Sequence, residues 1–292
     1  MERDPQPTSS PALPTRDLER RVREAVGAIR ARTALAPRVA FTLGSGLGGV
    51  IDALEGAVEF PTAELPHWPR STVPGHAGRL ALGTWRNVPV VALSGRSHRY
   101  EGYSLDRVTF AVRVMRALGA GTMIFTNAVG ALNRDYLPGD VMVATDHLNF
   151  IGRRGLFTPA ELTARRAGRT VAAVYSAALR ERLVAAAIEA GVPLHRGVLV
   201  GGHGPSYETA SEVRMARELG GDVACMSTVH EATVAAQLGA EVASLSCITN
   251  RATGLSERPL AHDEVTEVAD RAAVRLAAVL ERFLAAESGA DR

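Results

Sequence analysis

Short apolar runs alternate with longer amphipathic runs along most of the chain. The short runs predict buried strands at residues 39–43, 122–126, 141–145, 197–200 and 242–248. Two further runs, 79–85 and 88–94, are separated by Arg86-Asn87 and predict a pair of hairpin strands. The amphipathic runs predict helices at residues 17–32, 105–118, 171–190, 208–219, 229–238 and 263–284.

Strands that alternate with helices are typical of the α/β class with a parallel or mixed sheet flanked by helices. No linker or internal repeat interrupts the pattern, which predicts one domain over residues 16–288. Residues 1–15 are rich in Pro, Ser and Thr and predict a flexible tail. Residues 151–170 predict a surface loop.

The composition excludes several classes of protein. The 292 residues carry a formal net charge of +2, which argues against a nucleic-acid binder. No apolar run is long enough to span a membrane and no signal peptide begins the chain, so we expect no membrane partner and a cytoplasmic location. Cys225 and Cys247 both lie in apolar runs, which favours buried free thiols over a disulfide or a metal pair.

The loop at residues 44–49, Gly-Ser-Gly-Leu-Gly-Gly, follows a predicted strand. Its N–H groups and the Ser45 hydroxyl could bind an anion, although a plain tight turn is an equal alternative. Arg96 and His98 follow another strand and suit an oxyanion such as phosphate, with a solvated loop as the alternative. His76 lies in a glycine-flanked turn and could reach the same anion or simply face solvent.

Further polar candidates that could bind a small polar ligand lie mainly between residues 204 and 251. Glu208 starts a predicted helix, where it could bind ligand N–H groups or only complement the helix dipole. The Asn250 amide, near the end of an apolar strand, can donate to one ligand atom and accept from another. Ser227 follows Met226, whose ordinary role would be core packing. Asn127 follows the predicted strand at 122–126 and could cap a helix.

Together these motifs resemble the trimeric, low-molecular-mass purine nucleoside phosphorylases, from about residue 39 to the C-terminal helix. The similarity rests on residues 44–49, on Gly-His-Ala-Gly-Arg-Leu at 75–80 and on Gly-Arg-x-His-x-Tyr-Glu-Gly-Tyr at 95–103. It continues through 126–128, 139–142, 146–149, Gly-Pro-Ser-Tyr-Glu-Thr at 204–209, Met-Ser-Thr-Val at 226–229 and Ile-Thr-Asn at 248–250. The resemblance implies a partly barrel-like mixed sheet and a homotrimer.

The resemblance also implies roles for individual residues. Phosphate would be held by Ser45, His76, Arg96, His98, Ser227 and the backbone of Ala128. Ribose would contact Tyr100 and Met226, Tyr207 would stack on the base, Glu208 and Asn250 would read the purine, and His262 would meet the 5′-hydroxyl. The catalytic residues would be Asn250, Glu208 and His98.

The implied reaction is phosphate-dependent cleavage of 6-oxopurine (deoxy)ribonucleosides, with no metal or cofactor and with phosphate as co-substrate. Methylthioadenosine phosphorylases share the fold but typically carry aspartates in the segment that corresponds to residues 249–251. This chain has Thr-Asn-Arg there, which favours the 6-oxopurine reaction. The chain departs from the family pattern at His230, where proline is common, and at Arg153, near the usual position of a lid phenylalanine from the neighbouring subunit. A methylthioadenosine-type enzyme, or a specialised phosphorylase or hydrolase acting on a modified sugar, is therefore the alternative.

Overall fold

A computed structural model describes residues 15–44, 47–72, 78–152, 156–157, 173–255 and 262–289. The strands are β1 Val39–Leu43, β2 Glu55–Pro61, β3 Arg79–Trp85, β4 Val88–Ser94, β5 Thr122–Ala131, β6 Val141–Asn149, β7 Leu194–Gly201, β8 Val223–Cys225 and β9 Glu241–Arg251. The helices are α1 Thr15–Arg30, α2 Leu105–Val108, α3 Phe110–Ala117, α5 Ala177–Glu189, α6 Ala210–Glu218, α7 Val229–Gln237 and α8 His262–Gly289. Short 3₁₀ turns span Gly48–Ala53, Thr62–Glu64 and Arg99–Glu101.

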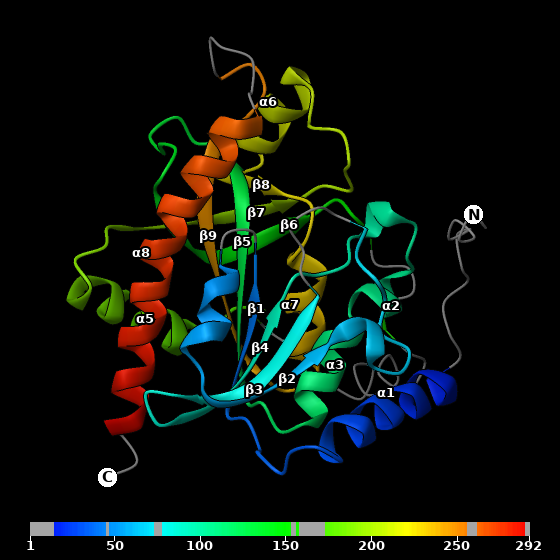
Figure 1. Cartoon of the computed structure of the whole chain (residues 1–292). Helices are drawn as coiled ribbons and strands as arrows, with labels where there is room; N and C mark the ends of the chain where they lie inside the picture. The colour runs from blue at the N-terminus through cyan, green and yellow to red at the C-terminus, as the bar shows by residue number, and fades with distance from the viewer. Residues whose placement is uncertain are drawn as a thin grey trace.

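The nine strands form one mixed sheet in the order β2-β3-β4-β1-β5-β8-β7-β6-β9 (Figure 1). An additional pairing of β5 with β9 closes the last five strands into a ring. Strands β4, β1, β5 and β9 run parallel to one another, so their carboxyl ends meet at one edge. This edge of an α/β sheet is where ligands usually bind. The predicted α/β class and the partly barrel-like mixed sheet are confirmed.

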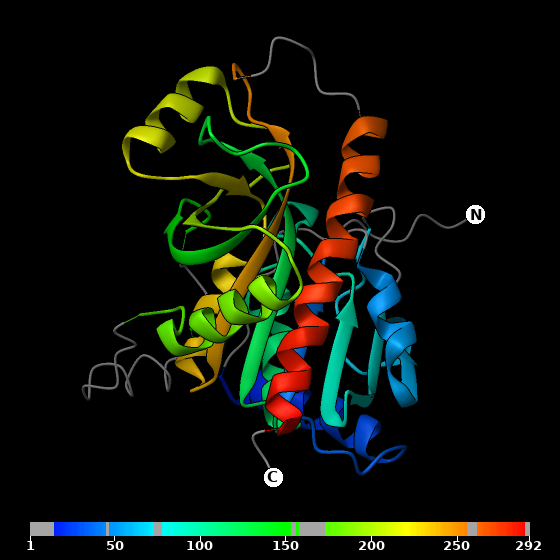
Figure 2. The ribbon, with the colours of Figure 1, turned by 90° about the vertical axis from the view of Figure 1, so that its left-hand side faces the viewer.

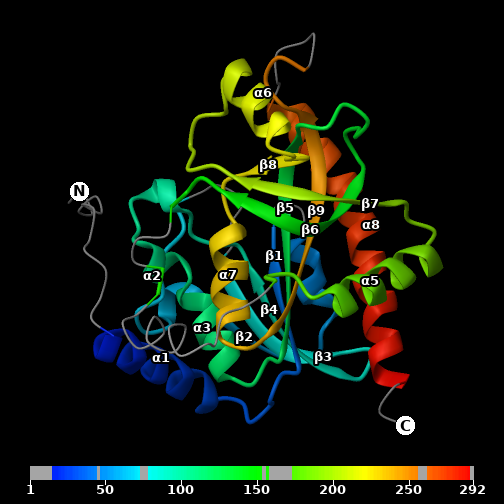
Figure 3. The same cartoon turned by 180° about the vertical axis from the view of Figure 1, so that it is seen from behind.

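Helices cover both faces of the sheet and define two main apolar cores. Helices α5 and α8 pack together on one face, where Leu183 and Leu280 are buried with strand residues such as Phe41 (Figure 2). Helices α1, α3 and α7 cover the opposite face, where Met115 and Val234 belong to the second core (Figure 3). Burial on both sides explains why the central strands read as continuous apolar runs.

Most predicted elements are confirmed, and β1, β3 and β4 have the predicted bounds. The prediction that Asn127 follows the end of a strand is wrong, because β5 continues to Ala131 by pairing with β9 along its length and with β8 at its end. The predicted helix at 105–118 is divided at Thr109 into α2 and α3. Strands β2 and β8 were not predicted, since one is largely exposed and the other has three residues.

Several predictions fall outside what the structure describes. The described residues do not include residues 1–14, most of the 151–170 loop, Ser45 or His76, and the side chain of His262 is not described either. The extent of the domain and the flexible tail stay predictions. Within the described part of the chain, no helix combines the length and apolar character that crossing a membrane requires.

Candidate functional site

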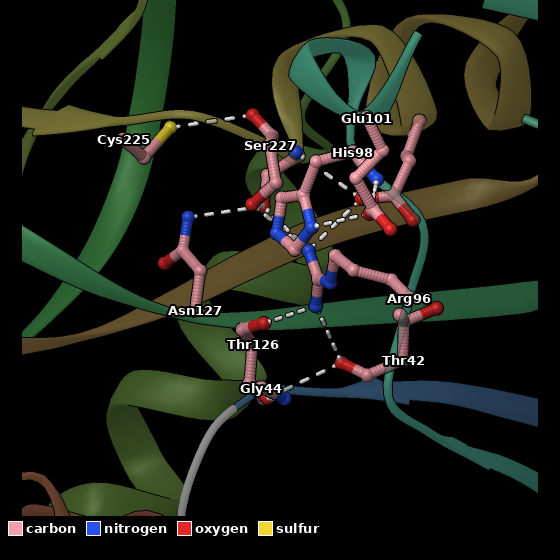
Figure 4. A network of polar contacts seen from close by, with 11 residues as sticks. Thr42, Gly44, Arg96, His98, Glu101, Thr126, Asn127, Cys225 and Ser227 are labelled. Carbon is pink, nitrogen blue, oxygen red and sulfur yellow. Dashed lines mark hydrogen bonds and ion pairs between the residues drawn. The ribbon is translucent and has the colours of Figure 1, made fainter. Parts of the chain in front are cut away.

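Arg96 is the centre of a buried polar network at the carboxyl edge of the parallel strands (Figure 4). It follows β4 after Gly95, whose φ of 88° turns the chain in a way that glycine tolerates best. Its Nη1 donates to Ser227 Oγ (3.2 Å), Thr228 Oγ1 (3.0 Å) and Glu231 Oε2 (2.9 Å), and its Nη2 donates to the carbonyl oxygens of Thr42 and Thr126. The guanidinium therefore joins β1, β5 and the start of α7, and the solvated-loop alternative is wrong for this residue.

Ser227 and Thr228 form a tight turn at the start of α7. The Val229 N–H donates to the Ser227 carbonyl at 2.7 Å, and Thr228 has φ 66° and ψ −53°. These values describe a γ-turn with a positive central φ, a rare and strained conformation for a residue with a side chain. The Thr228 hydroxyl also accepts a hydrogen bond from Asn127 Nδ2 at 3.0 Å. Asn127 thus supports this turn and does not cap a helix.

His98 lies in the same region and is held by two neighbours. Its ring stacks on Tyr100 with centroids 4.8 Å apart and planes 15° apart. Its Nδ1 lies 3.2 Å from Glu101 Oε1, and Glu101 also accepts hydrogen bonds from Thr72. Burial alone would raise the pKa of Glu101, but the hydrogen bonds from His98 and Thr72 outweigh it and lower the pKa to about 2. Glu101 stays ionised near neutral pH, and its contact with Nδ1 fixes the orientation of the His98 ring.

The residues predicted to bind sugar and base approach one another around two glycines. A Cβ on Gly202 would lie 2.9 Å from Glu208 Oε1, and a Cβ on Gly204 would lie 2.9 Å from the Tyr100 ring and 2.5 Å from Met226 Sδ. Burial, followed by the nearby Glu101 and Tyr207, raises the pKa of Tyr100. Tyr207 itself is 57 % exposed, so its ring is accessible for stacking.

Asn250 lies at the penultimate position of β9 and is half-buried. Its Oδ1 accepts a hydrogen bond from Thr249 Oγ1 at 2.8 Å, and its Nδ2 donates to the Arg251 carbonyl at 3.1 Å. Gly130 on β5 leaves room for this amide, since a Cβ there would lie 3.2 Å from Nδ2. The two contacts assign the amide oxygen and nitrogen and hold the side chain against the strand.

His230 is an unusual buried residue beside this network. It is 1 % exposed, and neither ring nitrogen has a hydrogen-bond partner among the described residues. Burial, opposed by Glu231, lowers the pKa of His230 to about 4. The imidazole is therefore neutral near pH 7.

The structure places Arg96, His98 and Ser227 in one cluster (Figure 4), and Ala128 has a half-buried position on β5, in register with Cys247. Cys225 and Cys247 are buried free thiols, and burial raises the pKa of Cys225 to about 11. The sequence reasoning missed four supporting residues, Glu101, Thr228, Glu231 and Thr249. The pattern Thr228-x-x-Glu231 is a capping-box signature and could have identified two of them.

The described side chains contain no group of three His, Cys, Asp or Glu residues that could hold a metal ion. The predicted roles of the site residues toward phosphate, sugar and base, and the prediction that no cofactor is needed, stay predictions.

The comparisons with known proteins agree with one another. Residues 38–285 match the family model described as Phosphorylase superfamily. The chain is 40% identical over 251 residues to purine nucleoside phosphorylase 1 of Bacillus subtilis, covering 86% of this chain and 93% of that protein. It is 38% identical over 247 residues to the Bos taurus purine nucleoside phosphorylase, covering 82% and 86%.

A solved structure of the Schistosoma purine nucleoside phosphorylase in complex with hypoxanthine superposes with a TM-score of 0.83 at 31% identity, covering 95% of this chain and 99% of that one. A second, of the Schistosoma mansoni enzyme with adenosine, gives a TM-score of 0.81 at 30% identity, covering 94% and 98%. The sequence resemblance and its extent along the chain are thereby confirmed. The chain belongs to the purine nucleoside phosphorylases of the phosphorylase superfamily.

Proposed function

We propose that this protein cleaves the N-glycosidic bond of 6-oxopurine nucleosides with inorganic phosphate, and that it releases a free purine and (deoxy)ribose 1-phosphate. Family membership supports purine nucleoside phosphorolysis, the reaction of a pentosyltransferase. The observation that carries the proposal is the buried cluster of Arg96, Ser227 and His98 at the same sheet edge as Asn250.

The anion half of the site would bind phosphate. Arg96 gives the cluster a cation, Ser227 a hydroxyl and His98 an imidazole held by Glu101. Ser45 and His76 would complete this half. Held beneath the sugar, a phosphate oxygen forms a bond to C1′ as the bond from C1′ to the purine nitrogen breaks. The sugar carries oxocarbenium character at that stage, and the negative phosphate stabilises it.

The base half would stabilise the leaving purine, which takes the electron pair of the broken bond. The Asn250 Nδ2 would donate to the 6-oxo oxygen, and its Oδ1 would accept from N7 once N7 is protonated, which is binding that strengthens in the transition state. Glu208 would accept the N1–H of a 6-oxopurine. Adenine has an unprotonated N1 that would face the carboxylate acceptor, so a preference for inosine and guanosine follows.

The sugar would lie between the two halves. Tyr100 and Met226, which border Gly204, would contact the ribose, and the exposed Tyr207 would stack on the base. His262 would meet the 5′-hydroxyl. The enzyme would need no cofactor or metal, because phosphate is the nucleophile and Asn250 with Glu208 serves the leaving group.

The assembly we propose is a homotrimer, with purine nucleoside and phosphate as ligands and a cytoplasmic location. Two large apolar side chains, Phe150 and Leu137, are about half exposed in the single chain and would be covered in an assembly. Light scattering should give about three times the chain mass of 30.9 kDa.

A substrate panel tests the function. Inosine, guanosine, adenosine and methylthioadenosine are each incubated with and without phosphate, and free base and sugar phosphate are quantified. We expect hypoxanthine and ribose 1-phosphate from inosine in the presence of phosphate only. Base release at the same rate without phosphate would indicate a hydrolase, and a preference for methylthioadenosine would overturn the assignment of Glu208 and Asn250.

A further inference from the structure

The donors around Thr228 constrain the direction of the hydrogen bond between the Thr228 and Ser227 hydroxyls. The Thr228 Oγ1 atom accepts from Arg96 Nη1 at 3.0 Å and from Asn127 Nδ2 at 3.0 Å. A hydroxyl oxygen has two acceptor positions and one hydrogen, so both acceptor positions are occupied. Its own hydrogen is then directed to Ser227 Oγ, 3.2 Å away.

Ser227 consequently has no acceptor position left. Its Oγ accepts from Thr228 and, at 3.2 Å, from Arg96 Nη1, whose two hydrogens are shared among Ser227, Thr228 and Glu231. Only the Ser227 hydrogen remains to be given to a ligand, and a hydroxyl with that arrangement is a donor to an anion. Because two donors polarise the oxygen, its hydrogen bond to an anion is strengthened.

Glu231 supplies the second half of the arrangement. Its carboxylate is 2 % exposed, lies 2.9 Å from Arg96 Nη1 and accepts the Thr228 N–H at 3.1 Å. One carboxylate thus supports the strained γ-turn and pairs with the cation of the anion site. On the other side of the cluster, the Glu101 carboxylate lies 3.2 Å from His98 Nδ1.

We propose that Thr228 and Glu231 are positioning residues of the phosphate site: Thr228 makes Ser227 an obligate donor to the anion, and Glu231 cancels the charge of Arg96. Phosphate is then held by directed hydrogen bonds more than by net charge. The advantage is chemical, since an uncompensated arginine would stabilise the phosphate before it attacks and weaken it as a nucleophile. This inference rests on the proposed phosphorolysis.

Two variant pairs separate geometry from charge. Thr228→Val removes the hydroxyl but keeps a β-branched side chain, and Thr228→Ser restores the hydroxyl. We expect the KM for phosphate to rise about tenfold in Thr228→Val, as for the loss of one hydrogen bond to a charged group, and to return close to wild type in Thr228→Ser. The KM for inosine should change by less than about twofold in both variants, which is within the scatter of such measurements.

Glu231→Gln keeps an acceptor for the Thr228 N–H but removes the charge, and Glu231→Asp keeps the charge on a shorter side chain. Glu231→Gln should lower the KM for phosphate by about threefold or more, reduce kcat and make kcat/KM for phosphate fall more steeply with sodium chloride. Glu231→Asp should raise the KM for phosphate and leave the salt slope of the wild type. A purely structural role predicts higher KM values in both variants and no change in slope.

Two results would overturn the inference: an unchanged KM for phosphate in Thr228→Val, or weaker phosphate binding in Glu231→Gln. If Glu231→Gln fails to fold, the salt dependence of kcat/KM for phosphate in the wild type tests the charge compensation instead. A compensated arginine predicts a shallow decrease with sodium chloride, and an uncompensated arginine predicts a steep one. Phosphate-independent base release by the wild type would refute the proposed function itself. The substrate panel on the wild type detects this result before any variant is compared.

Discussion

Acid should destabilise this protein through His230. The side chain is 1 % exposed, and neither ring nitrogen has a hydrogen-bond partner among the described residues. Burial, opposed by Glu231 and reinforced by Arg96, His98 and His147, lowers the pKa of His230 from 6.5 to about 4. The unfolded chain therefore binds a proton between these two pH values that the folded chain does not bind.

The sign and size of the effect follow from this difference. A folded pKa below the unfolded value means that stability falls as the pH falls through the window from 6.5 to about 4. Each pH unit is worth about 1.4 kcal/mol, so His230 should cost about 2 kcal/mol near pH 5 and about 3 kcal/mol below pH 4. Glu101, with a pKa of about 2, stays ionised in the folded state and adds acid sensitivity only below its unfolded value of 4.5.

Urea unfolding of wild type and His230→Leu at about pH 7.5 and about pH 5, at one protein concentration, measures the effect. Leucine has a similar volume, so no large cavity forms. The wild type should lose about 2 kcal/mol more than the variant on acidification. Equal losses in the two proteins would refute the reasoning. The matched control is His195→Gln, at a half-exposed histidine paired with Asp140, which should retain the acid sensitivity of the wild type.

Three further predictions concern the base half of the site. Asn250→Ala should lower kcat for inosine by about 10²–10³ because one transition-state donor is lost, while the KM for phosphate stays unchanged in steady-state assays. Glu208→Gln should lower kcat/KM for inosine by about tenfold to a hundredfold. It should also lower the ratio of kcat/KM for inosine to kcat/KM for adenosine, since an amide can donate to the unprotonated N1 of adenine. A ratio that stays constant would count against the role of Glu208. Gly202→Ala should raise the KM for inosine several-fold, because its Cβ would lie 2.9 Å from Glu208 Oε1, whereas Gly27→Ala, with no atom within 4 Å of its Cβ, should match wild type in the same assay.

The sequence predicted the strands that are buried on both faces and missed those that are not. Val39–Leu43 reads as an apolar run, interrupted only by Thr42, because the two cores lie on either side of it. Glu55–Pro61 is mostly exposed and carries no such signal. The polar Thr126-Asn127 pair suggested a strand end, but pairing with β9 continues the strand through it. Side chains that serve a site thus interrupt the apolar pattern without ending the element.

Local patterns and residue types along the chain were sufficient to predict the α/β class, the family motifs and five site candidates: Arg96, His98, Glu208, Ser227 and Asn250. How these groups are supported became visible only in the folded molecule. Arg96 meets Glu231 across 135 positions of sequence, and Thr228 is bound by Asn127 across 101. Such contacts depend on which strands are neighbours in the sheet, so charge compensation, hydroxyl direction and the neutrality of His230 arise only once the fold brings distant segments together.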